Sequence, residues 1–233
     1  MLGLSAEETE AALLSARVAL WCMLICVPPG IACGWLLAKR QFVGKSLFDA
    51  LLHLPMVLPP VVPGFLLLRL LGEQGALGHW LSNTFGIHLA FNWKGAVLAS
   101  AVMAFPLMVQ PVRLAMRLVD VRLEQAAATL GASPWRVFRT VTLPLALPGV
   151  LVGAVLAFSR SLGEFGATIA FVGNIPGETR TLPLAIYSYA HAIDGDAAAT
   201  RLMLLSIALA LAALLASNAL ARYGERRLGQ SHA

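Results

Sequence analysis

Long apolar runs alternate with short polar segments along the chain, and most of the runs are about as long as a membrane-spanning helix. A helix crosses the hydrocarbon of a bilayer with about 20 apolar residues. Such runs extend over residues 18–38, 46–71, 95–116, 144–158 and 202–220. The pattern predicts an all-α membrane protein with about five transmembrane helices.

Prolines interrupt the second run, and a shorter apolar stretch follows the fourth. The second run contains Pro55, Pro59, Pro60 and Pro63, and each proline removes a helical hydrogen bond. The shorter stretch, residues 165–172, makes six helices possible if it crosses the membrane by itself. We expect it instead to continue the fourth helix or to re-enter the membrane, because a sixth crossing places the basic C-terminus outside.

Composition places these helices in lipid rather than in a soluble core. Of the 233 residues, 58% are hydrophobic and 12% are charged, and the mean hydropathy is +0.77. Soluble domains carry about 25% charged residues, so this chain has too few polar groups to cover a water-exposed surface. The net charge of +5 comes from short basic clusters beside apolar runs, which is typical of membrane topology rather than of nucleic-acid binding.

The distribution of basic residues predicts the orientation. With five crossings and the N-terminus outside, eleven of the seventeen Lys and Arg residues lie on the cytoplasmic side, in agreement with the positive-inside rule. They are Lys39, Arg40, Lys45, Arg113, Arg117, Arg122, Arg136, Arg139, Arg222, Arg226 and Arg227. We therefore expect an external N-terminus and a cytoplasmic C-terminus.

A polar segment, EQAAATLGASPWRVFRTVTLP at residues 124–144, separates the third and fourth runs. Each charged residue at the centre of a bilayer costs about 2.5–3.5 kcal/mol, so this segment is expected in the cytoplasm. Val121–Leu130 is compatible with a helix, and Gly131 suits the left-handed conformation that ends many helices. We call residues 120–144 the knuckle.

The second half of the knuckle predicts another short helix. Ser133 and Pro134 fit an N-cap and a first turn, and Trp135 and Phe138 share an apolar face. Leu143 and Pro144 then end the segment and open the fourth span. Composition and spacing leave two interpretations open: the knuckle docks into another protein, or it lies on the lipid headgroups.

The knuckle resembles the EAA loop of ABC importer permeases. Ala126, Ala127 and Gly131 stand at the matching positions, and Val141–Pro144 close the pattern. Gln125 replaces the glutamate of that pattern, with Glu124 one position earlier. The resemblance implies a coupling helix that contacts an ATPase. The residues implied in this coupling are Glu124, Gln125, Ala126, Ala127, Gly131, Pro134, Trp135 and Phe138.

The resemblance extends over most of the chain. HLPMVLPPVVPGFLLL, LEQAAATLGASPWRVFRTVTLPLALPG and RSLGEFGATIAFVGNIPGETRTLPLAIY are most similar to the permeases of molybdate ABC importers, and sulfate/thiosulfate and tungstate permeases are close alternatives. The family implies a type I permease fold in the bacterial inner membrane, with one permease domain over residues 1–233. It also implies a homodimer, two ABC ATPase subunits and a periplasmic oxyanion-binding protein. No cofactor and no nucleic-acid partner are implied.

The sequence predicts no ATPase activity of its own. Gly44-Lys45-Ser46 resembles the end of a P-loop, but Lys39 stands where that motif requires a glycine. The three cysteines, Cys22, Cys26 and Cys33, fall within one apolar run and read as small buried hydrophobes rather than as a metal site.

Two segments are candidates for a translocation path. SRSLGEFG, at residues 159–166, places Ser159, Arg160, Ser161 and Glu164 in an apolar region, and ionisable groups within membranes usually face a bundle interior or a water path. Alternatively, Arg160 and Glu164 simply pair with each other. Pro59 and Pro60 either expose backbone toward a pore or form a packing kink.

A turn-rich segment, NIPGETRTLP at residues 174–183, falls outside in this topology. It either meets the binding protein or forms an ordinary solvated loop.

Overall fold

The computed structural model describes residues 5–227, which form helices and connecting loops without a strand. The helices are α1 (Ala6–Lys39), α2 (Lys45–Val57), α3 (Val61–Leu71), α4 (Ala76–Phe85), α5 (Trp93–Leu118), α6 (Val121–Thr129), α7 (Pro134–Val137), a π-helical turn (Phe138–Thr142), α8 (Leu143–Leu162), α9 (Gly166–Val172), α10 (Leu182–Ala190) and α11 (Asp196–Arg227). The all-α prediction is confirmed. The domain expected over residues 1–233 extends beyond the described residues at both ends.

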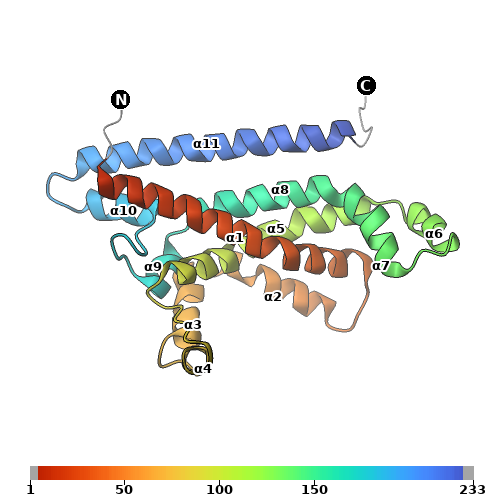
Figure 1. Cartoon of the computed structure of the whole chain (residues 1–233), viewed down its shortest axis with the longest axis horizontal. Helices are drawn as coiled ribbons and strands as arrows, with labels where there is room; N and C mark the ends of the chain where they lie inside the picture. The colour runs from red at the N-terminus through yellow and green to blue at the C-terminus, as the bar shows by residue number, and fades with distance from the viewer. Residues whose placement is uncertain (1–4, 228–233) are drawn as a thin grey trace.

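Four helices are long and apolar enough to cross a membrane: α1, α5, the continuous helix that joins α7 to α8, and α11. They run along the long axis of the molecule (Figure 1). A fifth span is formed if α2 and α3 count as one, although these two helices are bent by 110°. The expected number of about five spans is therefore confirmed.

The stretch 165–172 does not form a separate crossing. Its helix, α9, has seven residues and is about 10 Å long at 1.5 Å per residue, whereas the hydrocarbon of a bilayer is about 30 Å thick. Nor does α9 continue α8 directly, because α8 ends at Leu162 and residues 163–165 intervene. α9 packs instead against α3 and α5.

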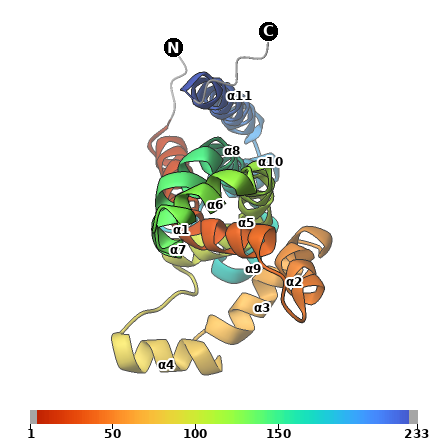
Figure 2. The same ribbon diagram turned by 90° about the vertical axis from the view of Figure 1, so that its right-hand side faces the viewer.

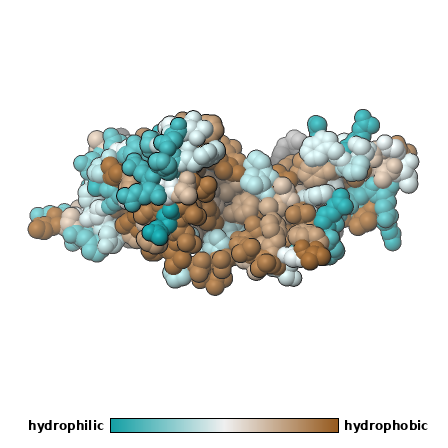
Figure 3. Space-filling view, turned by 90° about the horizontal axis from the view of Figure 1, so that it is seen from below, coloured by the Kyte–Doolittle hydropathy of each residue, from teal (hydrophilic) through white to brown (hydrophobic). Residues whose placement is uncertain are grey.

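Surface polarity follows the direction of the spans. On the face shown in Figure 3, hydrophobic residues cover most of the middle, and hydrophilic residues are more frequent toward the two ends of the long axis. The beginning of α1 and the end of α11 lie at opposite ends of this axis, and α6 and α7 lie at the same end as the end of α11 (Figure 1). This arrangement is the one required of a protein with an odd number of crossings.

The core of the bundle is a close packing of α1 and α8 on α5. On α1, Gly30 faces Met108 and Gly34 faces Val112. On α8, Gly153 lies against the backbone of Met108. Small residues four positions apart let membrane helices approach closely, and Gly30 with Gly34, like Gly149 with Gly153, has this spacing. These glycines therefore let the backbones of α1, α5 and α8 pack closely against one another.

Gly153→Leu is expected to destabilise this core. A Cβ atom at position 153 would lie 2.7 Å from the carbonyl oxygen of Met108 and 3.1 Å from the sulfur of the same residue. Overpacking a core costs about 1–3 kcal/mol. The thermal unfolding midpoint in detergent should fall by about 5 °C or more. Gly163→Leu is the matched control, because a Cβ at Gly163 meets nothing within 4 Å. Equal midpoints for the two variants would contradict the proposed packing.

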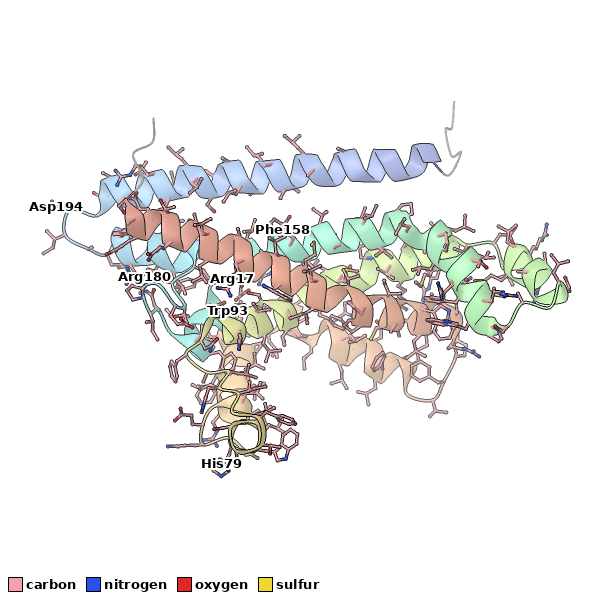
Figure 4. All side chains as sticks on the ribbon, viewed as in Figure 1. Arg17, His79, Trp93, Phe158, Arg180 and Asp194 are labelled. Carbon is pink, nitrogen blue, oxygen red and sulfur yellow. The ribbon has the colours of Figure 1, made fainter. Side chains whose placement is uncertain are left out.

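At the end of the bundle opposite to the knuckle, polar contacts hold the helices together. The fully buried Glu8 carboxylate pairs with Arg201 at 2.6 Å and so connects α1 to α11. Ser5 and Glu8 form a capping box at the start of α1. The Arg17 guanidinium lies 3.7 Å from the centre of the Trp93 ring, where α1 passes the start of α5 (Figure 4). These contacts fix how α1, α5 and α11 meet.

Candidate functional site

The first half of the knuckle folds as its sequence predicts. The Asp120 side chain accepts a hydrogen bond from the Arg122 amide and so caps α6. Gly131 follows α6 with φ of +82°, a conformation that side chains disfavour. The Ala132 amide donates a hydrogen bond of 3.1 Å to the Ala127 carbonyl, which caps the C-terminal end of α6. The chain thereby reverses within a few residues.

The second half of the knuckle differs from the prediction. Ser133 caps α7 as expected, but the helix does not stop at Leu143 and Pro144. Pro134–Leu162 is one helix of 29 residues, about 44 Å long. A π-helical turn forms the join, and in it the Leu143 amide donates to the Phe138 carbonyl. The knuckle thus ends in a rigid extension of a spanning helix.

The carboxylate of Glu124 ties the knuckle to the bundle. One oxygen lies 3.0 Å from Lys39 Nζ at the end of α1, and the other accepts a hydrogen bond of 2.6 Å from the Thr142 hydroxyl. Lys39 also donates to the Val119 carbonyl at 3.3 Å. Gln125, which stands in the glutamate position of the EAA pattern, is exposed. Glu124 therefore joins three segments of this chain, and Gln125 is free to meet a partner.

Apolar side chains are exposed on the knuckle although it lies at the polar end of the bundle. Leu130 is 89% exposed and Trp135 is 65% exposed. The Trp135 ring stacks on Phe138, with 5.4 Å between centroids, and Phe138 also meets Trp35 of α1. Of the other coupling candidates, Ala126 and Pro134 are exposed, and Ala127 is half-buried. Exposed apolar patches are typical of surfaces that contact another protein or a membrane, so this part of the knuckle is a candidate for either contact.

Glu124→Ala is expected to loosen the knuckle without unfolding the bundle. The change removes a hydrogen bond and a partly buried ion pair, and hydrogen bonds to charged groups contribute about 1.5–3 kcal/mol. Amide hydrogen exchange over residues 121–142 should accelerate by about tenfold or more. Gln125→Ala is the control and should leave the exchange unchanged. Wild-type protection in Glu124→Ala would show that this tie is unimportant.

The second part of the site is the junction where the α2–α3 bend meets the α8–α9 break. Gly166 lies so close to Pro60 that a Cβ on it would be 2.7 Å from the proline Cβ. Gly64 of α3 lies equally close to the backbone of Ala167. Two segments that the sequence offered separately as path candidates are thus in contact. Pro59 and Pro60 are exposed at this place.

Arg160 and Glu164 are paired at the junction, at 2.6 Å between Nη1 and Oε2. The Glu164 side chain is 1% exposed, and its Oε1 accepts a hydrogen bond from the Ala167 amide at 2.8 Å, which caps α9. Among the side chains that the structure describes, the buried hydroxyls of Ser159 and Ser161 find no hydrogen-bond partner. The pairing of Arg160 with Glu164, which the sequence left open as the alternative to a path-lining role, is present.

The loop over residues 174–183 is fastened rather than loose. Arg180 donates to Asn174 at 3.1 Å, and the Glu178 carboxylate accepts from the Trp93 amide at 3.3 Å. The Arg180 side chain lies beside α10 (Figure 4). Ile175, Pro176 and Gly177 are exposed. The loop therefore presents a small, fixed surface at the end of the molecule opposite to the knuckle.

Sequence reasoning missed the glycine packing of the core and the contact between the two path segments. The four-residue spacing of Gly30 with Gly34 is a signal that was available, whereas the contact of Pro60 with Gly166 joins positions more than 100 residues apart. Cys22 and Cys26 are buried and free. Within the described residues, no three His, Cys, Asp or Glu side chains are placed to hold a metal ion.

Comparison with known proteins identifies the family of this chain. Residues 30–230 match the family described as the inner membrane component of binding-protein-dependent transport systems. The molybdenum transport system permease protein ModB of Escherichia coli (strain K12) is 57% identical over 227 residues, which are 97% of this chain and 99% of that protein. The sulfate transport system permease protein CysT of the same organism is 36% identical over 201 residues, which are 86% of this chain and 72% of that protein.

A solved structure supports the fold independently. The structure of a bacterial ABC transporter involved in the import of the acidic polysaccharide alginate contains a chain that matches with a TM-score of 0.75 and 18% identity, over 95% of this chain and 81% of that one. At this identity, the similarity shows the fold, which is the ABC importer permease fold predicted from the sequence. The chain belongs to the family of inner membrane components of binding-protein-dependent transport systems.

Proposed function

We propose that this chain is the transmembrane permease subunit of an ABC importer that carries molybdate into the cell, while a separate subunit hydrolyses ATP. One observation carries the proposal: an exposed aromatic and apolar knuckle stands at the end of a spanning helix. The 57% identity to a molybdenum transport permease over nearly the whole chain supports molybdate as the cargo.

The continuity of α7 with α8 supports a lever mechanism. An ATPase that grips Trp135 and Leu130 would displace α7 as its nucleotide sites close. Because Pro134–Leu162 is one helix, the displacement passes into α8 without a flexible loop. α8 packs on α5 and α11 and ends beside the junction. Movement at the knuckle therefore changes the contact between Pro60 and Gly166, which we assign to the translocation path.

The basic residues support an orientation with the knuckle in the cytoplasm and the start of α1 in the periplasm. The knuckle then faces the ATPase, of which the complex holds two copies, one for each permease in a homodimer. α4 stands away from the bundle (Figure 2) and exposes Trp80. Phe65 and Leu66 of α3, the helix that leads to α4, are exposed as well. These side chains suit contact with the second copy and with lipid. The fastened loop at residues 174–183 suits docking of the periplasmic binding protein.

Uptake into reconstituted vesicles tests this function. The permease, its ATPase partner and the oxyanion-binding protein are assembled with ATP on the ATPase side and labelled molybdate on the binding-protein side. We expect accumulation that requires all three proteins and ATP. Accumulation without the ATPase, or none with the complete set, would contradict the function.

Sulfate is the second candidate cargo, because the chain is also 36% identical to a sulfate permease. The same vesicles, supplied with labelled sulfate and a sulfate-binding protein, decide between the two. We expect molybdate to be the ion that accumulates.

A further inference from the structure

A polar depression lies between α2 and α5, in the half of the bundle that carries the knuckle. Its volume is about 460 Å³, and it is lined by Asp49, His53, Gln110, Arg113, Leu114 and Arg117. These residues belong to neither the knuckle nor the junction.

Three polar residues of α5 face this depression in a helical register. Gln110, Arg113 and Arg117 are spaced three and four residues apart, so they lie on one side of the helix. Arg113 stands five residues before the end of α5, about 8 Å inside it. An arginine in contact with lipid tails is costly. The stripe therefore belongs to a water-filled mouth of the bundle rather than to its lipid face.

The Asp49 carboxylate holds the Arg113 guanidinium through one of its nitrogens. Its Nη1 donates to both Asp49 carboxylate oxygens, at 2.9 and 2.7 Å. Its Nε is buried and has no hydrogen-bond partner in the part of the chain whose side chains the structure describes. His53 stands behind Asp49, with its Nδ1 2.8 Å from the Asp49 carbonyl oxygen and 3.3 Å from a carboxylate oxygen. Asp49 therefore orients Arg113 through Nη1 alone, and 21% of the Arg113 side chain remains exposed.

The charge of the lining favours an anion. Asp49 offsets one of the two arginines, and Arg117 is exposed and unopposed by any ion pair among the described residues. Asp49, Arg113 and Arg117 together give the lining one net positive charge. A guanidinium edge presents parallel N–H groups that match the oxygens of a tetrahedral oxyanion, and the Gln110 amide adds a further donor.

We propose that Arg113, Arg117 and Gln110 form an oxyanion site at the inner mouth, which takes the transported dianion as it leaves for the cytoplasm. The inference rests on the proposed function and deepens it, because it names where the cargo is held in this subunit. The depression is roomy and open, so the ion keeps part of its hydration and binds weakly. Weak binding suits an exit site, from which the cargo must depart.

Binding of labelled molybdate to the permease–ATPase complex in phosphatidylcholine nanodiscs, without the binding protein, tests the site. We expect saturable binding that weakens by about tenfold or more in Arg117→Gln, because one hydrogen bond to a charged group is lost. Gln110→Leu should weaken it by about threefold and serves as the second variant should Arg117→Gln fail to fold. Lys94→Gln removes an exposed cation at the other end of α5 and should bind like the wild type. Wild-type affinity in both site variants, or no saturable binding to the wild type, would overturn the proposal.

Two further arms separate the alternatives. A lipid headgroup phosphate shares the chemistry of an oxyanion, so the measurement is repeated with added phosphatidylglycerol; we expect molybdate binding to persist, and its complete displacement would assign the depression to lipid instead. Uptake is measured on the same preparations with the binding protein present. If uptake occurs without detectable binding, the oxyanion site is contradicted and the proposed function stands. If uptake is absent, the proposed function itself is contradicted.

Discussion

A permease that carries Trp135→Asp is expected to insert and fold normally but to lose both its ATPase partner and ATP-driven uptake. Trp135 is 65% exposed at the tip of α7, so the substitution disturbs few internal contacts. Tryptophans at the centre of protein interfaces commonly contribute about 2 kcal/mol or more, and the new carboxylate would have to be desolvated as well. We expect the ATPase to bind at least about thirtyfold more weakly.

Co-purification of the ATPase and vesicle uptake measure this effect. Ile193→Asp is the matched control, because Ile193 is 97% exposed at the end of the bundle opposite to the knuckle, and its replacement should leave the ATPase bound. Gly131→Pro offers a second test at the turn, since proline cannot adopt the φ of +82° found there. If Trp135→Asp kept its ATPase and transported at the wild-type rate, the knuckle would not be the coupling element.

Breaking the Arg160–Glu164 pair is expected to have the second largest effect. Glu164 is 1% exposed and lies 2.6 Å from Arg160, and removing one partner of a buried ion pair costs about 3–5 kcal/mol. Glu164→Leu also removes the cap on the Ala167 amide. We expect a strongly lowered unfolding midpoint and no measurable uptake for this variant.

The double variant Arg160→Met, Glu164→Gln separates the two interpretations of this pair. It removes both charges while the glutamine oxygen can still accept from Ala167, and replacing a whole buried pair is often close to neutral for stability. If Arg160 contacts the cargo, the double variant should be nearly as stable as the wild type and still fail to transport. Restored uptake would show that the pair only holds the junction together and that Arg160 does not line the path.

Local chemistry let the sequence predict much of the knuckle. Gly131, Ser133 and Pro134 act within a few residues of their own positions, and the structure places each one as expected. The apolar runs similarly predict the spans, because helix length and hydrophobicity are properties of a single segment. The continuity of α7 with α8 escaped prediction, since Pro144 reads as a break and only the π-helical turn before it carries the helix onward.

Contacts between segments that are distant in the chain could not be predicted from the sequence. Pro60 and Gly166 were each recognisable as irregular, but nothing local indicates that they touch. Glu124 was considered as a contact for the ATPase, and its pairing with Lys39 depends on how α1 ends beside the knuckle. The Asp49–Arg113 pair likewise joins two spans. Tertiary packing decides such contacts, and residue type only limits them.

Labelling of single cysteines from the two sides of the membrane tests the central claim that the knuckle lies in the cytoplasm, where a motor subunit can reach it. Ser133→Cys reports on the exposed knuckle, and Ile193→Cys reports on the opposite end of the bundle, where Ile193 is 97% exposed. The native Cys22 and Cys26 are buried, and the wild type provides the background. With a membrane-impermeant maleimide, Ser133→Cys should react in inside-out vesicles and not in spheroplasts, and Ile193→Cys should show the reverse. Reaction of Ser133→Cys in intact spheroplasts would contradict the topology and the coupling that depends on it.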